Sequence, residues 1–285
     1  MSRERLGKAL EHLQQCDRLE SVHSVRKEIK KVRATLGLLR EQIDKGSYRK
    51  YAKSLRAAAK HLTDPRDAHV RPRTLERLIV YFKDRLPIRP FSEIKKVLRQ
   101  NCLEETRELM NGESVARVDR ILRKINRRVK DIKVKAEGWA AIRSGFRENY
   151  SCGREALEVV LKEQSSENFH QWRKHVQDLW HQLRLLCPIQ PEQLRATADT
   201  MKTLSQHLGD DHDLVMLRQF VVRRCARRCP AEVKLLNELI RLRQKELRSA
   251  ALAIGSRFYA EKPSLFCRRI ENYWRTWRAV KKSKD

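Results

Sequence analysis

Two widely separated segments of this 285-residue chain carry histidine and cationic residues in the same order. The matched pairs are His23 with His170, Arg26 with Arg173, and Lys27 with Lys174. Arginine binds phosphate oxygens through two parallel hydrogen bonds, lysine supplies a mobile positive charge, and histidine titrates near neutral pH. These residue types in this order indicate a site that binds an anion.

The first segment has the pattern of an amphipathic helix. Its apolar residues recur every three or four positions and predict one buried stripe. They are Val22, Val25, Ile29, Val32, Leu36 and Leu39. The opposite face carries a ridge of His23, Arg26, Lys27, Lys30 and Arg33. We therefore expect a helix over residues 22–40 whose polar face is almost wholly cationic.

The second segment repeats both faces of the first. Its apolar stripe is Phe169, Trp172, Val176, Leu179, Leu183 and Leu186. Its polar face is His170, Arg173, Lys174, Gln177, His181 and Arg184. Like charges one turn apart repel by a few tenths of a kcal/mol per pair. A bound anion would remove this repulsion.

An exposed, solvated face is the ordinary interpretation of a charged helix. Such a face usually interleaves its two signs. Between residues 22 and 60, however, twelve Lys and Arg stand against three Asp and Glu. Together with the repetition in the second segment, this imbalance favours anion binding.

A second duplicated element follows each ridge, at residues 61–67 and 207–213. We expect each element to end one helix and begin the next, because Asp64, Asp210 and Asp211 are good helix N-caps and Gly209 suits a left-handed turn. Asp67 and its counterpart Asp213 would either belong to such caps or orient neighbouring cations toward the ligand.

The second of these elements also permits a metal site. Its potential ligands are His207, Asp210, His212 and Asp213. A metal-dependent phosphohydrolase would need further His and Asp ligands from other helices. The surrounding cations would repel a divalent ion, so we expect no metal and no cofactor.

Composition indicates a folded, strongly basic protein. Apolar residues make up 40% of the chain, and 64 Lys and Arg against 36 Asp and Glu give a net charge of +28. Such an excess implies a partner of opposite sign. No run approaches the roughly 20 apolar residues that span a bilayer, and the seven cysteines lack C-x-x-C spacing. We expect a cytoplasmic protein with reduced thiols and no membrane partner.

Sparse glycine and proline and the helical spacing of the apolar residues predict an all-α fold of about ten helices. Helix breaks are expected at several places, including Arg71-Pro72 and Gly209. The repetition of the charged helical segment, and of the element that follows it, indicates an internal duplication. We predict one domain over 1–285 with two pseudo-symmetric helical bundles, residues 1–150 and 151–285, around a basic central cavity.

These motifs resemble those of the CHAD family, the histidine-containing α-helical domain. The matching residues of the first half are Val22-His23-Ser24-Val25-Arg26-Lys27, Lys30, Lys31, Arg33, Leu62, Arg66-Asp67 and Val70. Those of the second half are Tyr150, Gly153-Arg154, Phe169 to Lys174, Leu179, Leu208-Gly209-Asp210 and Asp213-Leu214. The chain departs from the family pattern at Thr63, His69, Gln177 and His181.

The resemblance implies non-catalytic binding of inorganic polyphosphate in a central basic groove, and an association with polyphosphate granules. The predicted contact residues are His23, Arg26, Lys27, Lys30, Lys31, Arg33, Lys53, Arg56, Arg147, Arg154, His170, Arg173, Lys174, His181 and Arg184. A neighbouring polyanion would favour the protonated form of a histidine, so binding should strengthen as pH falls toward 6.

Nucleic acid is the principal alternative partner, because a net charge of +28 suits RNA equally well. Aromatic residues make up 6% of the chain, and Phe169 and Trp172 lie on the apolar stripe. Few aromatic side chains are therefore left for stacking on bases. A phosphate chain without bases fits the sequence better. A Gly-rich phosphate loop is also missing from the sequence, which disfavours a phosphotransferase.

Overall fold

The computed structural model describes residues 2–14, 18–87, 90–129 and 131–283, and within these ranges it is all-helical. The first six helices are α1 (Ser2–Leu13), α2 (Arg18–Leu38), α3 (Lys45–His61), α4 (Thr63–Tyr81), α5 (Ser92–Met110) and α6 (Glu113–Val129). The others are α7 (Gly138–Lys162), α8 (Ser166–Leu186), α9 (Pro191–Cys225), α10 (Pro230–Phe258) and α11 (Pro263–Lys282). Short 3-10 helices lie at Lys83–Arg85 and Cys187–Ile189. The predicted all-α class is confirmed.

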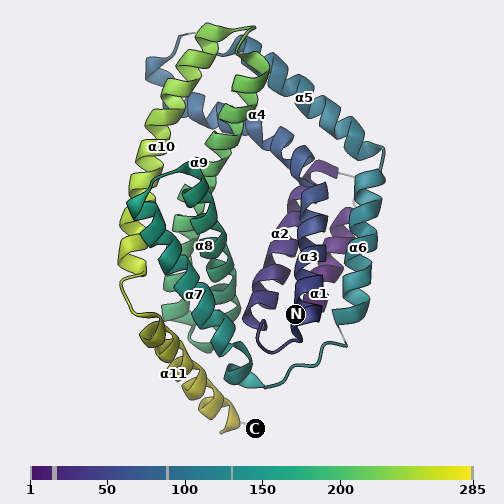
Figure 1. The fold of residues 1–285 in the computed structure, drawn as a ribbon, viewed down its shortest axis with the longest axis vertical. Coiled ribbons are helices and arrows are strands. Elements are labelled where there is room, and N and C mark those ends of the chain that lie inside the picture. The colour runs from purple at the N-terminus through teal and green to yellow at the C-terminus, as the bar shows by residue number, and fades with distance from the viewer. Residues whose placement is uncertain (1, 15–17, 88–89, 130, 284–285) are drawn as a thin grey trace.

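The apolar side chains gather in three clusters. The first core joins α1, α2, α3 and α6 and includes Val25, Ile29 and Leu122. The second core joins α7, α8 and α11 with the facing parts of α9 and α10, and includes Trp172 and Phe266. In Figure 1 these two cores lie on opposite sides of the molecule.

The third cluster, here called the shared core, combines elements from both halves of the sequence. Leu75 of α4 and Leu98 of α5 pack with Leu217 of α9 and Leu236 of α10. Figure 1 shows α4 and α5 crossing above the first core to reach the upper ends of α9 and α10. Two bundles were expected, but these long helices extend past the second core and bury a further apolar surface.

The predicted stripe of α8 is buried throughout, and that of α2 is buried except for Leu36 and Leu39, which are half-buried. Val22, Val25, Ile29 and Val32 of α2 lie in the first core, and the six stripe residues of α8 lie in the second. The amphipathic period therefore predicted correctly which faces of α2 and α8 point inward. The cationic faces are left to meet between the two cores.

Two expected helix breaks were wrong. Pro72 lies inside α4 and Gly209 lies inside α9. Around Pro72 the helix is held by Arg71, which donates to Asn101 of α5 at 2.8 Å and lies over the ring of Phe220 of α9. These tertiary contacts stabilise α4 where proline removes one backbone hydrogen bond.

Close backbone packing joins the two halves near the end of α2. A Cβ atom at Gly145 of α7 would lie 2.4 Å from the carbonyl oxygens of Gly37 and Leu38. Gln182 of α8 donates to the carbonyl oxygen of Ala34 at 3.1 Å. The expected boundary at 150/151 falls within α7, and the connection between the halves is the segment 131–137 that precedes this helix.

Candidate functional site

Four cationic side chains from three helices meet between the first and second cores. We call Arg26 and Lys30 of α2, Arg66 of α4 and Arg173 of α8, with the carboxylates of Asp67 and Asp213, the central cluster. Both carboxylates are buried. The cluster therefore sets four basic side chains against two carboxylates.

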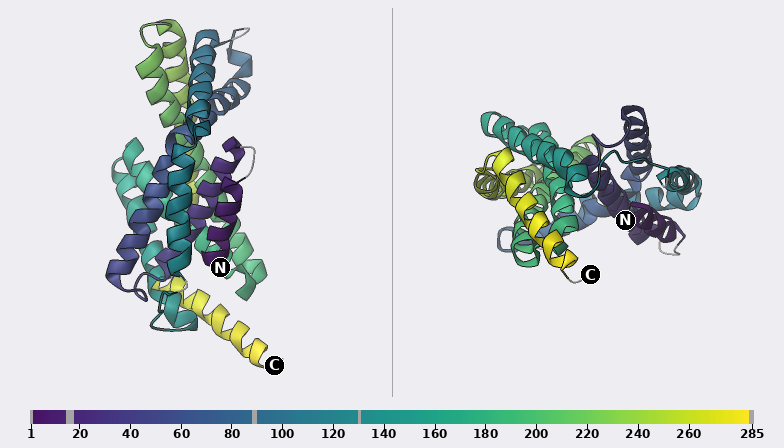
Figure 2. Two further views of the ribbon diagram at one scale, coloured as in Figure 1. Left: turned by 90° about the vertical axis from the view of Figure 1, so that its right-hand side faces the viewer. Right: turned by 90° about the horizontal axis from the view of Figure 1, so that it is seen from below.

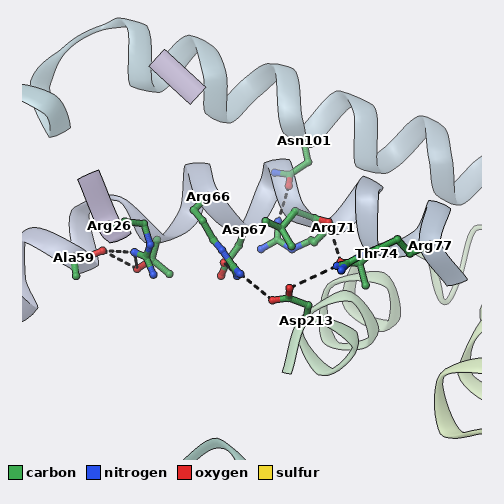
Figure 3. A network of polar contacts seen from close by, with 11 residues as sticks. Arg26, Ala59, Arg66, Asp67, Arg71, Thr74, Arg77, Asn101 and Asp213 are labelled. Carbon is green, nitrogen blue, oxygen red and sulfur yellow. Dashed lines mark hydrogen bonds and ion pairs between the residues drawn. The ribbon is translucent and has the colours of Figure 1, made fainter. Parts of the chain in front are cut away.

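Arg66 connects the two carboxylates of the cluster. Its Nη1 donates to Oδ1 of Asp67 at 2.8 Å, and its Nη2 donates to Oδ1 of Asp213 on α9 at 3.0 Å (Figure 3). Burial lowers the pKa of Arg66, but the two carboxylates outweigh this effect and raise it above the ordinary value. Asp67 and Asp213 thus hold the guanidinium of Arg66 in place.

The positive charge of Lys30 is poorly compensated by neighbouring negative charge. Burial, and then the positive charges of Arg173, Arg26 and Arg66, lower its pKa to about 7, while Asp213 acts in the opposite direction. A charged group is costly to bury without a partner. An anion between α2 and α8 would supply that partner.

Arg26 and Arg173, which match in the two halves, have different surroundings. Arg26 donates from Nη1 to the carbonyl oxygen of Ala59 at 2.5 Å and to Oγ1 of Thr63 at 3.0 Å (Figure 3). Arg173 lies against Gly209, whose added Cβ would be 3.9 Å from its Nε. This buried Nε has no hydrogen-bond partner in the described part of the chain. Arg173 is therefore less constrained by hydrogen bonds within the protein than Arg26.

Three histidines, carried by α8 and α9, lie beside the cluster. The rings of His170 and His212 stack with centroids 4.5 Å apart. Burial, Arg173 and His170 lower the pKa of His212 to about 3, and burial followed by Lys30 lowers that of buried His181 to about 3. Burial and nearby cations also lower the pKa of His23 and His170. Without a ligand, the structure therefore favours neutral imidazoles near pH 7.

Asp178 of α8 is a further carboxyl group near the cations. Burial raises its pKa to about 6, and the positive charges of Arg33 and Lys30 partly offset this effect. Arg33 therefore lies near the same carboxyl group as Lys30. With this pKa, Asp178 is mostly ionised at pH 7 and adds a negative charge near Arg33 and Lys30.

Other predicted contact residues have different environments. Lys31 pairs with Glu28 on its own helix, Lys174 donates to Gln171, and the guanidinium of Arg184 lies over the ring of Trp180. Lys27 is exposed, but its charge acts on His23 and His181. These side chains lie on or beside the ridges of α2 and α8 but outside the central cluster.

Four further predicted contact residues, on α3 and α7, also lie outside the cluster. Lys53 and Arg56 are exposed on α3. Arg147 is exposed on α7, and its charge acts on Cys267 of α11. Arg154 pairs with Glu158 at 3.5 Å. Lys53, Arg56 and Arg147 were selected for their positive charge, and Arg154 also for its match to the family pattern. Neither criterion specifies the direction of a side chain.

The second duplicated element also differs from its prediction. Residues 207–213 lie within α9, so Asp210 and Asp211 cap no helix and Gly209 forms no terminal turn. The helix continues because Leu204, Leu208 and Leu217 bury its apolar side. Gly209 instead leaves space beside Arg173.

The potential metal ligands have other partners. Asp210 accepts from Arg77 at 2.8 Å, Asp213 accepts from Arg66, and His212 stacks on His170. Among the described residues, no group of three or more His, Cys, Asp or Glu side chains is arranged to hold a metal ion. This donor set therefore does not fit a metal centre.

A cavity of about 910 Å³ adjoins the cluster. Its lining includes His23, Arg66 and Asp213, and also His69, Arg73 and Arg77 of α4. The sequence interpretation treated Arg66 as a motif residue and His69 as a departure from the family pattern rather than as ligand contacts, and it overlooked Arg73 and Arg77. The spacing of these four residues, at three and four positions, was the signal that could have identified them.

These features define an all-helical protein with a cation-rich centre between its two halves. A family model of the CHAD domain matches residues 4–222, and the chain belongs to the CHAD domain family. No curated protein matches it. Its fold is similar to that of PptA from Streptomyces chartreusis, with 13% sequence identity and a TM-score of 0.65 over 91% of this chain and 96% of the other. No helix in the described ranges is long and apolar enough to cross a membrane.

Proposed function

We propose that this protein binds inorganic polyphosphate without altering it, through the central cluster and the facing ridges of α2 and α8. The observation that carries this proposal is the meeting of Arg26, Lys30, Arg66 and Arg173 with two buried carboxylates as counter-charges. Membership of the CHAD family, whose resemblance implies this ligand, supports it. We place the activity in the cytoplasm, at polyphosphate granules.

The chemistry of the cluster suits a linear phosphate chain. Arginine supplies paired hydrogen bonds to phosphate oxygens, and lysine adds a point charge. Each bound phosphate would release counterions, so affinity should fall steeply as salt rises. Phe169 and Trp172 are buried in the second core, which leaves the cluster without these two rings as platforms for nucleobases.

Substitution of Arg173 tests the site with little risk to folding, because this side chain makes no hydrogen bond within the described structure. Arg173→Gln should weaken polyphosphate binding roughly 10- to 100-fold, since it removes a charge-assisted contact. Calorimetric titration gives the affinity, and circular dichroism gives the helicity. Wild-type affinity in a folded Arg173→Gln variant would contradict the proposed site.

A matched control removes cations from a different surface. Arg120 and Lys124 are exposed and one turn apart on α6. The double variant Arg120→Gln/Lys124→Gln loses more charge than Arg173→Gln but should keep polyphosphate affinity within about twofold. Equal losses in the two proteins would indicate binding through net charge rather than through the central cluster.

Competition separates the proposal from its alternatives. At fixed salt, long-chain polyphosphate should displace single-stranded RNA from the protein, whereas preferential retention of RNA would favour a nucleic-acid-binding function. Incubation of polyphosphate with the protein and divalent metal ions should release no phosphate. Steady release that is lost in His212→Ala would instead favour a phosphohydrolase.

A further inference from the structure

We propose that the phosphate path continues from the central cluster along one face of α4, through the cavity of about 910 Å³. This part of the path is here called the second limb. It would hold the continuation of a long polyphosphate chain whose first phosphates lie in the central cluster. The inference rests on the proposed function and adds to it a length-selective site. It concerns α4, which the predicted ridges of α2 and α8 did not include.

One face of α4 carries a row of basic or titratable side chains. Arg66, His69, Arg73 and Arg77 follow one another at steps of three and four residues, and all four line the cavity. At 100° per residue they lie within one narrow sector of the helix. The row is about 16 Å long, because a helix rises about 1.5 Å per residue. An elongated row suits an extended chain better than a compact anion.

The row is continuous with the central cluster. Arg66 belongs to both, and Asp213 of α9 links its two ends by accepting from Arg66 at 3.0 Å and lying 3.8 Å from Nη2 of Arg77. His23 of α2 lines the same cavity. A ligand could therefore pass from the central cluster onto α4 along a surface that carries more basic than acidic side chains.

The charge of this cavity is incompletely balanced. Arg73 is exposed and has no hydrogen bond or ion pair within the described ranges. Asp213 is already bonded to Arg66. Glu76 also lines the cavity and makes no ion pair with the described cations, so its carboxylate would repel a bound phosphate. This face of α4 thus carries charges of both signs that can be removed by substitution.

Chain length distinguishes this limb from the central cluster. Tripolyphosphate is short and should occupy the cluster, where the cations are most concentrated, whereas long-chain polyphosphate should occupy both places. We therefore expect Arg73→Gln/Arg77→Gln to weaken long-chain binding roughly tenfold while tripolyphosphate affinity stays within about twofold. The salt dependence of long-chain binding should become shallower by on the order of one unit per lost contact.

Glu76→Gln provides a test of opposite sign. Removal of this carboxylate should strengthen long-chain binding and leave tripolyphosphate binding unchanged. Arg73→Gln alone serves as a second variant, because Arg73 has no partner to lose in the described structure, whereas Arg77 pairs with Asp210. The Arg120→Gln/Lys124→Gln protein is the control for lost charge.

The outcomes separate this inference from the proposed function. Wild-type protein that binds neither phosphate ligand contradicts the proposed function itself. Wild-type binding of both ligands, with unchanged long-chain affinity in the folded Arg73 and Arg77 variants, overturns the second limb alone. Equal weakening of both ligands by these variants also overturns it, since the α4 cations would then act on the central cluster.

Discussion

Lys30 shows how this protein differs at the residue scale from one with an ordinary basic surface. Its ammonium group lies among three arginines, and burial together with their charges lowers its pKa to about 7. In unfolded chains lysine titrates near 10.5. The unfolded state therefore binds more protons between these values, so this group opposes folding fully below pH 7 and progressively less toward pH 10.5.

Replacement of this lysine by an uncharged side chain of similar size tests the argument. Lys30→Met should raise the melting temperature of the ligand-free protein, by more at pH 6 than at pH 9, and should weaken polyphosphate binding. Thermal denaturation at both pH values measures the first effect. Lys27→Met, on the exposed part of the same helix, should change the melting temperature little. A destabilised Lys30→Met protein at pH 6 would show that Lys30 has a structural partner.

Residue types and spacing identified two members of the central cluster. Arg26 and Arg173 were identified as a pair, and both belong to the central cluster. Arg66 was not identified as a contact, because its position next to Asp67 suggested a local turn rather than an ion pair with α9. Ion pairs between distant helices depend on how those helices cross, which spacing along one helix does not specify.

At the scale of the element, α2 and α8 were predicted well because each is amphipathic along its length. Their apolar stripes occupy two different cores, as expected for helices from two halves. The α9 helix was not predicted, because Gly209 and two adjacent aspartates resemble a helix end. Tertiary packing on both sides of Gly209 overrides this local preference, since leucines are buried before and after it.

The contact between α7 and α2 gives a prediction for a single methyl group. Gly145→Ala should destabilise the protein by about 1–3 kcal/mol, because the new Cβ would overlap the backbone of Gly37 and Leu38. Gly37→Ala is the matched control on the facing helix. Its Cβ would meet Nε2 of Gln182 at 3.6 Å, an ordinary contact, and alanine favours helix by up to about 1 kcal/mol.

Urea denaturation of both glycine variants measures these differences. The expected order of stability is Gly37→Ala at or above wild type, and Gly145→Ala clearly below it. Equal stability of the Gly145→Ala protein and wild type would mean that α7 and α2 separate easily. In that case their close approach would not fix the spacing between the two halves.

For the whole molecule, the shared core is the feature that a division into two bundles did not anticipate. It joins α4 and α5 to α9 and α10 at one end, while the segment 131–137 connects the halves at the other end (Figure 1). Figure 2 shows α11 projecting beyond this second end, away from the shared core. The two halves are therefore held together both covalently and by buried apolar surface.

Cleavage of the connecting segment should leave the halves associated. A protease site inserted between Val134 and Lys135, in an exposed stretch, should give two fragments that co-elute in gel filtration and keep their helicity. Leu236→Ala in the shared core should lower the temperature at which the cleaved protein dissociates, because truncation of a buried leucine costs about 2–5 kcal/mol. Separate elution of the fragments at room temperature would contradict this role of the shared core.

The unequal charge of the central cluster also affects how long the protein would persist in a cell. Under the proposed function, the empty protein is destabilised by its own half-buried cations, and a bound polyanion stabilises the folded state by mass action. Proteases degrade the transiently unfolded population. The lifetime of this protein would then increase with the supply of its ligand, so that its abundance follows phosphate storage without a dedicated sensor.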